Sequence, residues 1–278
     1  MARGKDDVMQ LFSSWTGSDF LLLYAMLLAF ACLAAWWIPA RLREPGRRGS
    51  IDDLESIAVL AGGRARFADT LLADLFVRGA LEPAGKGKLG VAARDLTVPP
   101  AGQALLAHDA PLTLGEAVKL LATHADRVAA RLQRAGLLMR GGADTRLRWL
   151  SIAPFLFLLV LGIYRHRAGS ALGEPTEFLS VLLVLTAVLA VIRYAKSDPR
   201  TAAGIAVVRE LRAKNGRFSR APRAEEAAMA VALFGTGVLV GTPWEPVHAM
   251  RQKESDGGSD SSSDGGSGCG GGCGGCGG

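Results

Sequence analysis

Two long uncharged apolar runs near the middle of the chain constrain its fold more than any other feature. The first extends from Trp149 to Tyr164 and the second from Phe178 to Ile192, with a short polar link between them. A hydrocarbon core about 30 Å thick is crossed by roughly 17 to 25 helical residues, so each run spans it when its aromatic or basic flanks lie among the headgroups. The two runs therefore predict a membrane hairpin.

A third apolar run, from Phe20 to Ile38, lies far upstream of the hairpin. The residues before it mix basic and acidic side chains and lack the positive region of a cleavable signal peptide, so the run is predicted to be a retained anchor. A lipoprotein signal that ends at Cys32 is a competing interpretation. It is disfavoured because Phe30 is too bulky for the small position that precedes such a cysteine.

The distribution of basic residues predicts the orientation of these three runs. Of 32 Lys and Arg, 2 precede residue 20, 17 lie between residues 41 and 148, 2 lie between 165 and 177, and 11 follow residue 192. Basic residues stay on the cytoplasmic side of spanning helices. The N-terminus and the 165–177 link are therefore predicted to be external, and both long polar regions cytoplasmic.

The polar region after the first run begins with a predicted pair of helices. Ser50 and Asp53 resemble a capping box, and helical spacing of apolar residues continues to Gly62-Gly63. A second helix is predicted to end at Gly79, with three apolar side chains buried: Leu71, Leu75 and Phe76. Two short strands around a turn follow, up to Val91. Helix, helix and hairpin are the outline of part of a winged-helix unit.

A similar pattern recurs further along this region. Thr113 and Glu116 form a second predicted capping box, and apolar residues at helical spacing continue to Gly136 in what reads as two helices. The recurrence favours a mostly helical insert. Two copies of one helix-hairpin unit are one arrangement that the pattern allows.

The polar region after the hairpin contains one ambiguous apolar segment. Asp198-Pro199 is a suitable helix start, and that helix is predicted to end at Asn215-Gly216. The segment from Ala227 to Val240 is then apolar but short and rich in Ala and Gly. A helix packed on the cytoplasmic domain, or lying in the membrane interface, is favoured over a fourth span.

The sequence offers no constellation typical of an enzyme or of a cofactor site. Its four histidines are scattered over different segments, and phosphate-loop, nucleophile-elbow and zinc-protease motifs are absent from it. The helix near residues 67–78 could present Arg64, Arg66 and Arg78 to nucleic-acid phosphates, but Asp69 and Asp74 share it. Protein contact is therefore favoured over nucleic-acid binding.

The C-terminal segment is compositionally different from the rest of the chain. After Arg251 it consists mostly of Gly, Ser and Asp, which cannot bury enough apolar area to fold. It carries three of the four cysteines: Cys269, Cys273 and Cys276. Three thiolates are candidate ligands for a soft metal, but glycines provide no supporting groups around them. A flexible tail, metal or redox capture, and enzymatic modification all remain open.

These features predict a mainly α protein with three transmembrane helices. The successive segments are an external N-terminus (1–19), a transmembrane helix (20–38), a cytoplasmic winged-helix-like domain (39–148), a second transmembrane helix (149–164), an external loop (165–177), a third transmembrane helix (178–194), a cytoplasmic helical segment (195–250) and a disordered tail (251–278).

The run from Asp52 to Gly63, followed by Thr70 to Gly79, resembles the start of a bacterial membrane-protein family to which no activity is assigned. Members of that family are similar in their Asp-x-x-Glu-x-Ala-x-Leu-Ala-Gly-Gly motif, hydrophobic hairpin, late Ala-Leu-Phe-Gly235 type motif and Gly-rich tail that often carries Cys. Leu54 stands where a Tyr is common. The resemblance implies an inner-membrane location and an architecture, without a mechanism.

Two function classes follow from these observations. The first is a membrane scaffold or interaction protein, which is not an enzyme and whose cytoplasmic domain docks a protein partner. The second is a membrane-bound regulatory or signalling module that uses the winged-helix-like insert.

Overall fold

The computed structural model describes residues 17–47, 49–85, 87–171, 177–220 and 222–257. This part of the chain is mainly helical and divides into two compact units. Unit 1 combines residues 1–43 with 141–198, and unit 2 combines residues 44–140 with 199–278. Each unit is therefore built from two separate stretches of sequence.

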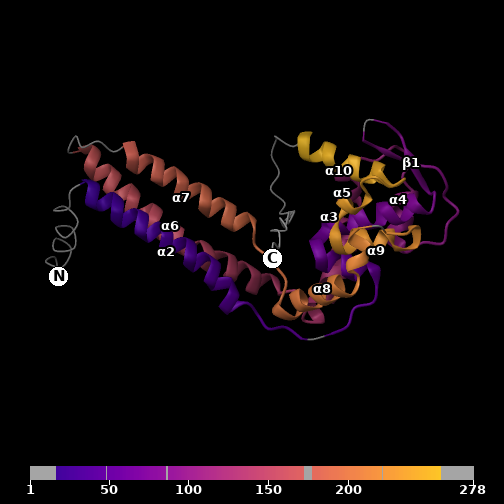
Figure 1. Ribbon diagram of the computed structural model, residues 1–278, viewed down its shortest axis with the longest axis horizontal. Coiled ribbons are helices and arrows are strands. Elements are labelled where there is room, and N and C mark those ends of the chain that lie inside the picture. Colours follow the sequence, from indigo (N-terminus) through magenta and orange to yellow (C-terminus); the bar gives the residue numbers. More distant parts are fainter. Residues whose placement is uncertain (1–16, 48, 86, 172–176, 221, 258–278) are drawn as a thin grey trace, which may run out of the picture. The chain divides into compact units, whose positions relative to one another are not determined.

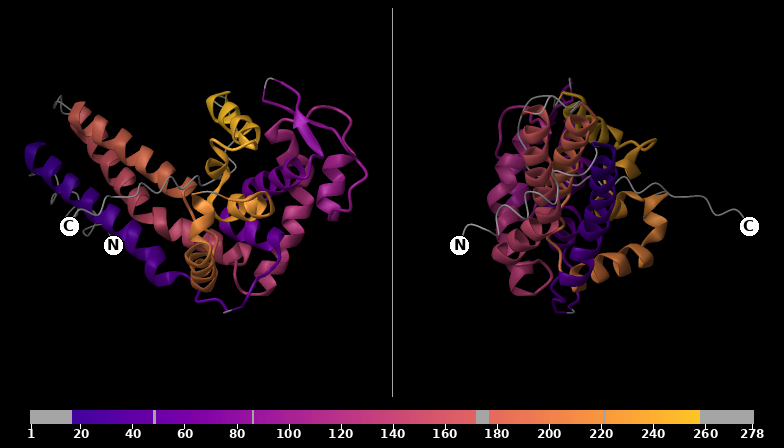
Figure 2. Two further views of the ribbon diagram at one scale, coloured as in Figure 1. Left: turned by 45° about the vertical axis from the view of Figure 1, so that its right-hand side comes forward. Right: turned by 90° about the vertical axis from the view of Figure 1, so that its left-hand side faces the viewer.

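Unit 1 is a bundle of three long helices. Helices α2 (Gly17–Leu42), α6 (Gly141–Ala171) and α7 (Glu177–Ala195) lie side by side in Figure 1 and in both views of Figure 2, and α6 contacts the other two. All three are long and apolar enough to cross a membrane. Large apolar side chains remain exposed on each of them, for example Trp36 (77% exposed), Phe157 (67%) and Phe178 (73%). A surface of this kind is expected where lipid, and not water, is the solvent.

A buried polar contact in the interior of the bundle joins α2 to α7. Tyr24 of α2 is fully buried, and its hydroxyl lies 3.1 Å from Thr186 Oγ1 of α7. The Thr186 hydroxyl donates its single proton to the Leu182 carbonyl, so Tyr24 is the donor in this pair. Gly162 of α6 leaves room for the Tyr24 ring, because a Cβ at that position would lie 2.9 Å from Tyr24 Cε2.

Unit 2 is a helical domain with one small hairpin. Its elements are α3 (Leu54–Val77), β1 (Leu81–Pro83), β2 (Leu89–Val91), α4 (Pro100–Leu106), α5 (Leu114–Arg134), α8 (Ala202–Lys214), η1 (Gly216–Ser219), α9 (Ala224–Phe234), η2 (Thr236–Leu239) and α10 (Glu245–Gly257). Strands β1 and β2 pair antiparallel, with Leu81 opposite Val91.

Helix α3 is the centre of unit 2. It packs against α5 on one side and α9 on another, and its buried apolar residues join theirs in a single core. Helix α10 is fixed to α3 by an ion pair between Arg251 and the buried carboxylate of Asp69, at 2.9 Å. Burial raises the pKa of the Asp69 carboxyl above its ordinary value, and Arg251 opposes that rise. The insert and the C-terminal polar region, which the sequence presents as separate segments, thus share one core.

Three connecting segments, residues 44–47, 136–139 and 199–204, form a hydrogen-bonded clasp in unit 2. The Glu44 carbonyl accepts from Ala202 N–H (2.9 Å), the Leu137 carbonyl accepts from Thr201 N–H (3.1 Å), and the Gly136 carbonyl accepts from Arg47 N–H (3.2 Å). The single proton of the buried Thr201 hydroxyl is shared between the Gly136 and Leu137 carbonyls, and the hydroxyl oxygen caps α8 by accepting from Gly204 N–H. In the sequence, the three boundaries between the units, at 43/44, 140/141 and 198/199, each fall beside one of these segments.

Several local expectations are confirmed and others are wrong. The hairpin is present, and Thr113 and Glu116 form the predicted capping box. Gly62-Gly63 does break α3, because Gly63 adopts a left-handed φ of 68°. However, the cap of α3 is Asp53, which accepts from Ser56 N–H, and the predicted cap at Ser50 is wrong. Helix α8 is likewise capped by Thr201, three residues after the predicted Asp198.

The second half of the insert differs from the expected repeat. Helix α5 runs without a break from Leu114 to Arg134, because no Gly or Pro follows Gly115 of its first turn. The segment after it makes an isolated bridge between Leu138 and Arg200 instead of a second hairpin. The ambiguous stretch 227–240 is formed by α9, which is buried against α3, and by the short η2 turn.

Candidate functional site

A cavity of about 80 Å³ lies in unit 1, where the three long helices bring their basic ends together. Ten residues line it: Pro39, Arg43, Asp144, Leu147, Arg148, Ser151, Arg193, Lys196, Ser197 and Asp198. They come from the end of α2 and the residue after it, the first turns of α6, the end of α7 and the residues directly after α7. Because α6 runs opposite to α2 and α7, its beginning meets their ends.

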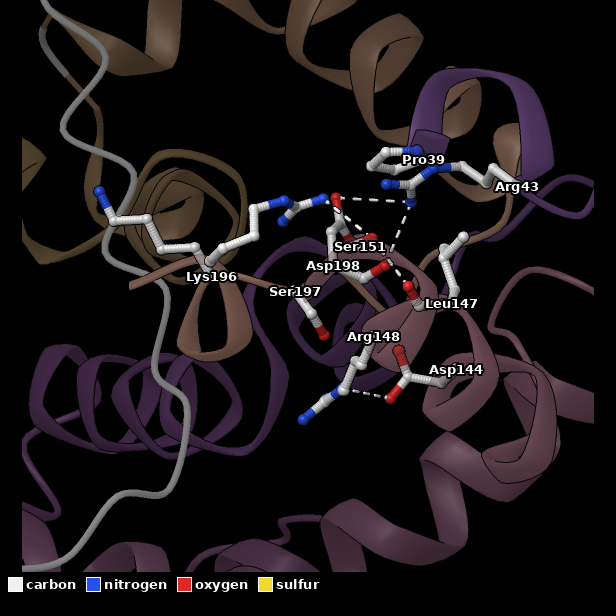
Figure 3. A pocket seen from close by; sticks show the side chains of 10 residues that line it. Pro39, Arg43, Asp144, Leu147, Arg148, Ser151, Lys196, Ser197 and Asp198 are labelled. Atoms are coloured by element: carbon white, nitrogen blue, oxygen red, sulfur yellow. Dashed lines mark hydrogen bonds and ion pairs between the residues drawn. The ribbon is translucent and has the colours of Figure 1, made fainter. Parts of the chain in front are cut away.

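Two ion pairs occupy opposite sides of this cavity (Figure 3). Arg43 Nη1 donates to the Asp198 carbonyl at 3.2 Å and lies 3.8 Å from the Asp198 carboxylate. Arg148 Nε lies 2.8 Å from Asp144 Oδ2, although its N–H is not aligned for a hydrogen bond. Both carboxylates of the cavity therefore already have a cationic partner.

The remaining two cations have no such carboxylate partner among the residues that the structure describes. Arg193 is held by neutral groups, because its Nε donates to the Ala35 carbonyl (3.1 Å) and its Nη2 to Ser151 Oγ (3.4 Å). Lys196 is exposed, and in Figure 3 its ammonium group extends away from the two ion pairs. The four basic and two acidic side chains give the cavity an excess of two positive charges.

Three buried polar atoms of the lining have no hydrogen-bond partner within the described ranges. They are Ser197 Oγ and Arg148 Nε, which each have a proton to donate, and Asp144 Oδ1, which accepts. A buried polar group without a partner costs about 1–3 kcal/mol. The cavity therefore holds both positive charge and unused hydrogen-bonding capacity.

The cysteines that the sequence singles out, Cys269, Cys273 and Cys276, lie outside the described residues, so the thiolate hypothesis stays a prediction. Cys32 is a free, exposed cysteine on α2. Across the described ranges, no group of three or more His, Cys, Asp or Glu side chains is arranged to hold a metal ion.

The three arginines that were candidates for phosphate contact are engaged inside unit 2. Arg64 pairs with Asp126 through two hydrogen bonds of 2.8 and 2.9 Å. Arg66 donates to the Val231 carbonyl at the end of α9, and Arg78 pairs with Asp74 on its own helix. Their arrangement favours a role in holding unit 2 together.

The sequence pattern does not single out this cavity. Arg43, Arg193 and Lys196 enter that pattern only within the counts of basic residues that predict orientation. Since basic residues at same-side ends of adjacent spans must come together when the spans pack, that charge pattern contains the information needed to predict a basic cluster.

Comparison of the chain with protein-family models, with curated proteins and with solved structures found no match.

Proposed function

We propose that this chain is a multi-pass membrane protein that holds unit 2 at the cytoplasmic face as a docking module for a protein partner. One observation carries the proposal: the three helices of unit 1 expose large apolar side chains, whereas unit 2 buries its apolar residues in a closed core. A bilayer is the solvent that suits the first surface, and water suits the second.

The charge distribution supports the orientation. The basic residues flank the end of α2, the start of α6 and the end of α7, while the 165–177 link has only two. The positive-inside tendency then places both stretches of unit 2 in the cytoplasm of a bacterial cell, with the N-terminus outside.

The clasp supports a scaffolding role for unit 2. Residues 44–47, 136–139 and 199–204 are the three segments of unit 2 that adjoin the spanning helices in sequence. They are hydrogen-bonded to one another within unit 2. A domain tethered in this way is held at the bilayer and presents the rest of its surface to other proteins. Catalysis forms no part of this proposal.

The second candidate function is a winged-helix-like regulatory module. The second half of α3 followed by the β1–β2 hairpin favours it, since a helix and an adjacent hairpin are the elements with which such modules contact their ligand. The engagement of Arg64, Arg66 and Arg78 within unit 2 argues against nucleic acid as the ligand.

Site-specific photo-crosslinking in living cells separates these functions. A photoreactive residue is placed at Thr123 or Ser219, which are exposed on unit 2, and at Leu22, which faces outward on α2, as the matched control. The proposal predicts one discrete protein adduct from unit 2 positions and only lipid adducts from position 22. Nucleic-acid adducts from unit 2, together with salt-sensitive retardation of DNA by the purified full chain, would replace it with the regulatory function.

A further inference from the structure

We propose that the cavity at the basic end of the three-helix bundle binds the phosphate of a polyol headgroup, and that its natural source is an anionic phospholipid such as phosphatidylglycerol. The inference rests on the proposed membrane insertion but not on the proposed protein partner. It starts from the two cations of the cavity, Arg193 and Lys196, that lack a carboxylate partner in the described part of the chain.

Arg193 is pre-positioned to bind an oxyanion. Its guanidinium has five N–H groups, and two of them are used by the Ala35 carbonyl and Ser151 Oγ. These two bonds to neutral acceptors hold the planar group in one orientation without neutralising its charge. A fixed guanidinium of this kind is well suited to phosphate, because charge-assisted hydrogen bonds to phosphate oxygens are short and strong.

Three lining atoms without a hydrogen-bond partner in the described part of the chain specify the ligand further. Ser197 Oγ and Arg148 Nε are donors without an acceptor, which a phosphate oxygen supplies. Asp144 Oδ1 is an acceptor without a donor, and a phosphate diester has no proton to give it. A hydroxyl group beside the phosphate does supply that proton. Glycerol and inositol phosphates combine both features, whereas a choline headgroup has no hydroxyl and adds a positive charge.

The position of the cavity identifies the source as a lipid. Its residues lie at the ends of three apolar helices, and aromatic side chains typical of the headgroup region lie beside them: Trp36, Trp37, Trp149 and Tyr194 are all exposed there. Arg41 stacks over the Trp37 ring at 5.3 Å, as expected at a membrane–water interface. Basic pockets between spanning helices are recurrent sites for anionic headgroups.

Native mass spectrometry of the full chain in detergent tests this proposal, with phosphatidylglycerol, phosphatidylcholine and soluble glycerol phosphate as probes. We expect one tightly bound phosphatidylglycerol and weaker binding of phosphatidylcholine. Lys196→Gln should weaken phosphatidylglycerol binding about fivefold, and Arg193→Gln roughly tenfold or more. Arg41→Gln is the matched control, because Arg41 lies at the same end of α2 but does not line the cavity, and it should change binding less than about twofold.

The outcomes are distinguishable. Equal weakening by Arg41→Gln and Lys196→Gln would mean diffuse electrostatic adsorption and would overturn the site, as would equal affinity for the two lipids. Glycerol phosphate that binds as tightly as the lipid, and is lost in the same variants, would keep the phosphate site but replace its source by a soluble metabolite. If Arg193→Gln fails to fold, Lys196→Gln combined with Ser197→Ala decides the matter, because neither change removes a hydrogen bond seen in the described structure.

Discussion

Thr201 shows how much one side chain contributes to this architecture. Its hydroxyl lies 2.9 Å from the Gly136 carbonyl, 3.0 Å from the Leu137 carbonyl and 3.1 Å from Gly204 N, so it joins two of the clasp segments and caps α8. The neighbouring glycines leave the space that this contact needs. A Cβ on Gly204 would lie 2.2 Å from the Leu137 carbonyl oxygen, and one on Gly46 would lie 2.4 Å from Thr201 Oγ1.

Thr201→Ala should therefore destabilise the clasp by about 1–3 kcal/mol, because it removes the cap of α8 and a buried hydrogen bond. Hydrogen exchange of the α8 amides in the full chain measures this locally, and exchange there should accelerate. Thr201→Ser is the control, since it keeps the hydroxyl, and it should behave almost as the native chain does. Equal acceleration in both variants would assign the effect to the lost methyl group instead.

At the scale of single residues, the sequence predicts caps and breaks only where the signal is unambiguous. Thr113 with Glu116 is a full capping box, and it forms as predicted. Asp53 and Thr201 are caps that the sequence leaves in competition with nearby Ser50 and Asp198, and tertiary contacts decide between them. Thr201 is selected because its hydroxyl also meets the Gly136 and Leu137 carbonyls, which are 64 or more residues away in sequence.

At the scale of elements, the crossing of the three long helices depends on Gly162. A Cβ there would lie 2.7 Å from Leu183 Cδ2 of α7 and 2.9 Å from the Tyr24 ring of α2, so both neighbouring helices approach α6 at this point. Close approach at a small residue is the usual way in which helices pack in membranes, where no hydrophobic effect drives them together.

Gly162→Ala should therefore destabilise the bundle by about 1–3 kcal/mol, despite the better helix propensity of Ala. Gly142→Ala, on the same helix but with open space around its Cβ, is the matched control and should be neutral or slightly stabilising. The measurement is the thermal unfolding midpoint of the detergent-solubilised chain. A Gly162 variant as stable as the Gly142 variant would show that the helices do not cross tightly at this residue.

The existence of the three long helices was predictable because uncharged runs of this length have few other folds available. The residues at which these helices begin and end were less predictable. The predicted second span begins at Trp149, whereas α6 begins at Gly141, because charged residues such as Asp144 and Arg148 continue the helix and pair along it. These two extra turns carry three of the four α6 residues that line the cavity, Asp144, Leu147 and Arg148, which is one reason why the site was not predicted.

At the scale of the whole molecule, the shared core of unit 2 was predicted only in outline, as one of the two placements favoured for residues 227–240. Residues 44–140 and 199–257 are separated in sequence by two of the long helices, yet α3 from the first stretch packs on α9 from the second. The Ala-rich, apolar character of α9 indicates that it is buried. It does not indicate the partner, because packing between distant segments leaves no local pattern in the sequence.

The core shared by these two distant stretches also constrains the membrane topology. Because both stretches of unit 2 contribute to one core, they lie on the same side of a membrane. This agrees with α6 crossing the membrane in one direction and α7 crossing it back. The resemblance to a bacterial membrane-protein family, and the function of the tail cysteines, stay predictions that this constraint leaves untouched.

Cysteine accessibility in intact cells tests the central claim most directly. In a full chain whose four native cysteines are changed to Ser, single cysteines are introduced at Ser170, exposed in the last turn of α6, or at Ser219, exposed on unit 2. A membrane-impermeant maleimide should label the Ser170→Cys variant in intact cells and the Ser219→Cys variant only after lysis. Labelling of the Ser219→Cys variant in intact cells, or protection of the Ser170→Cys variant until lysis, would contradict a three-span protein with unit 2 in the cytoplasm.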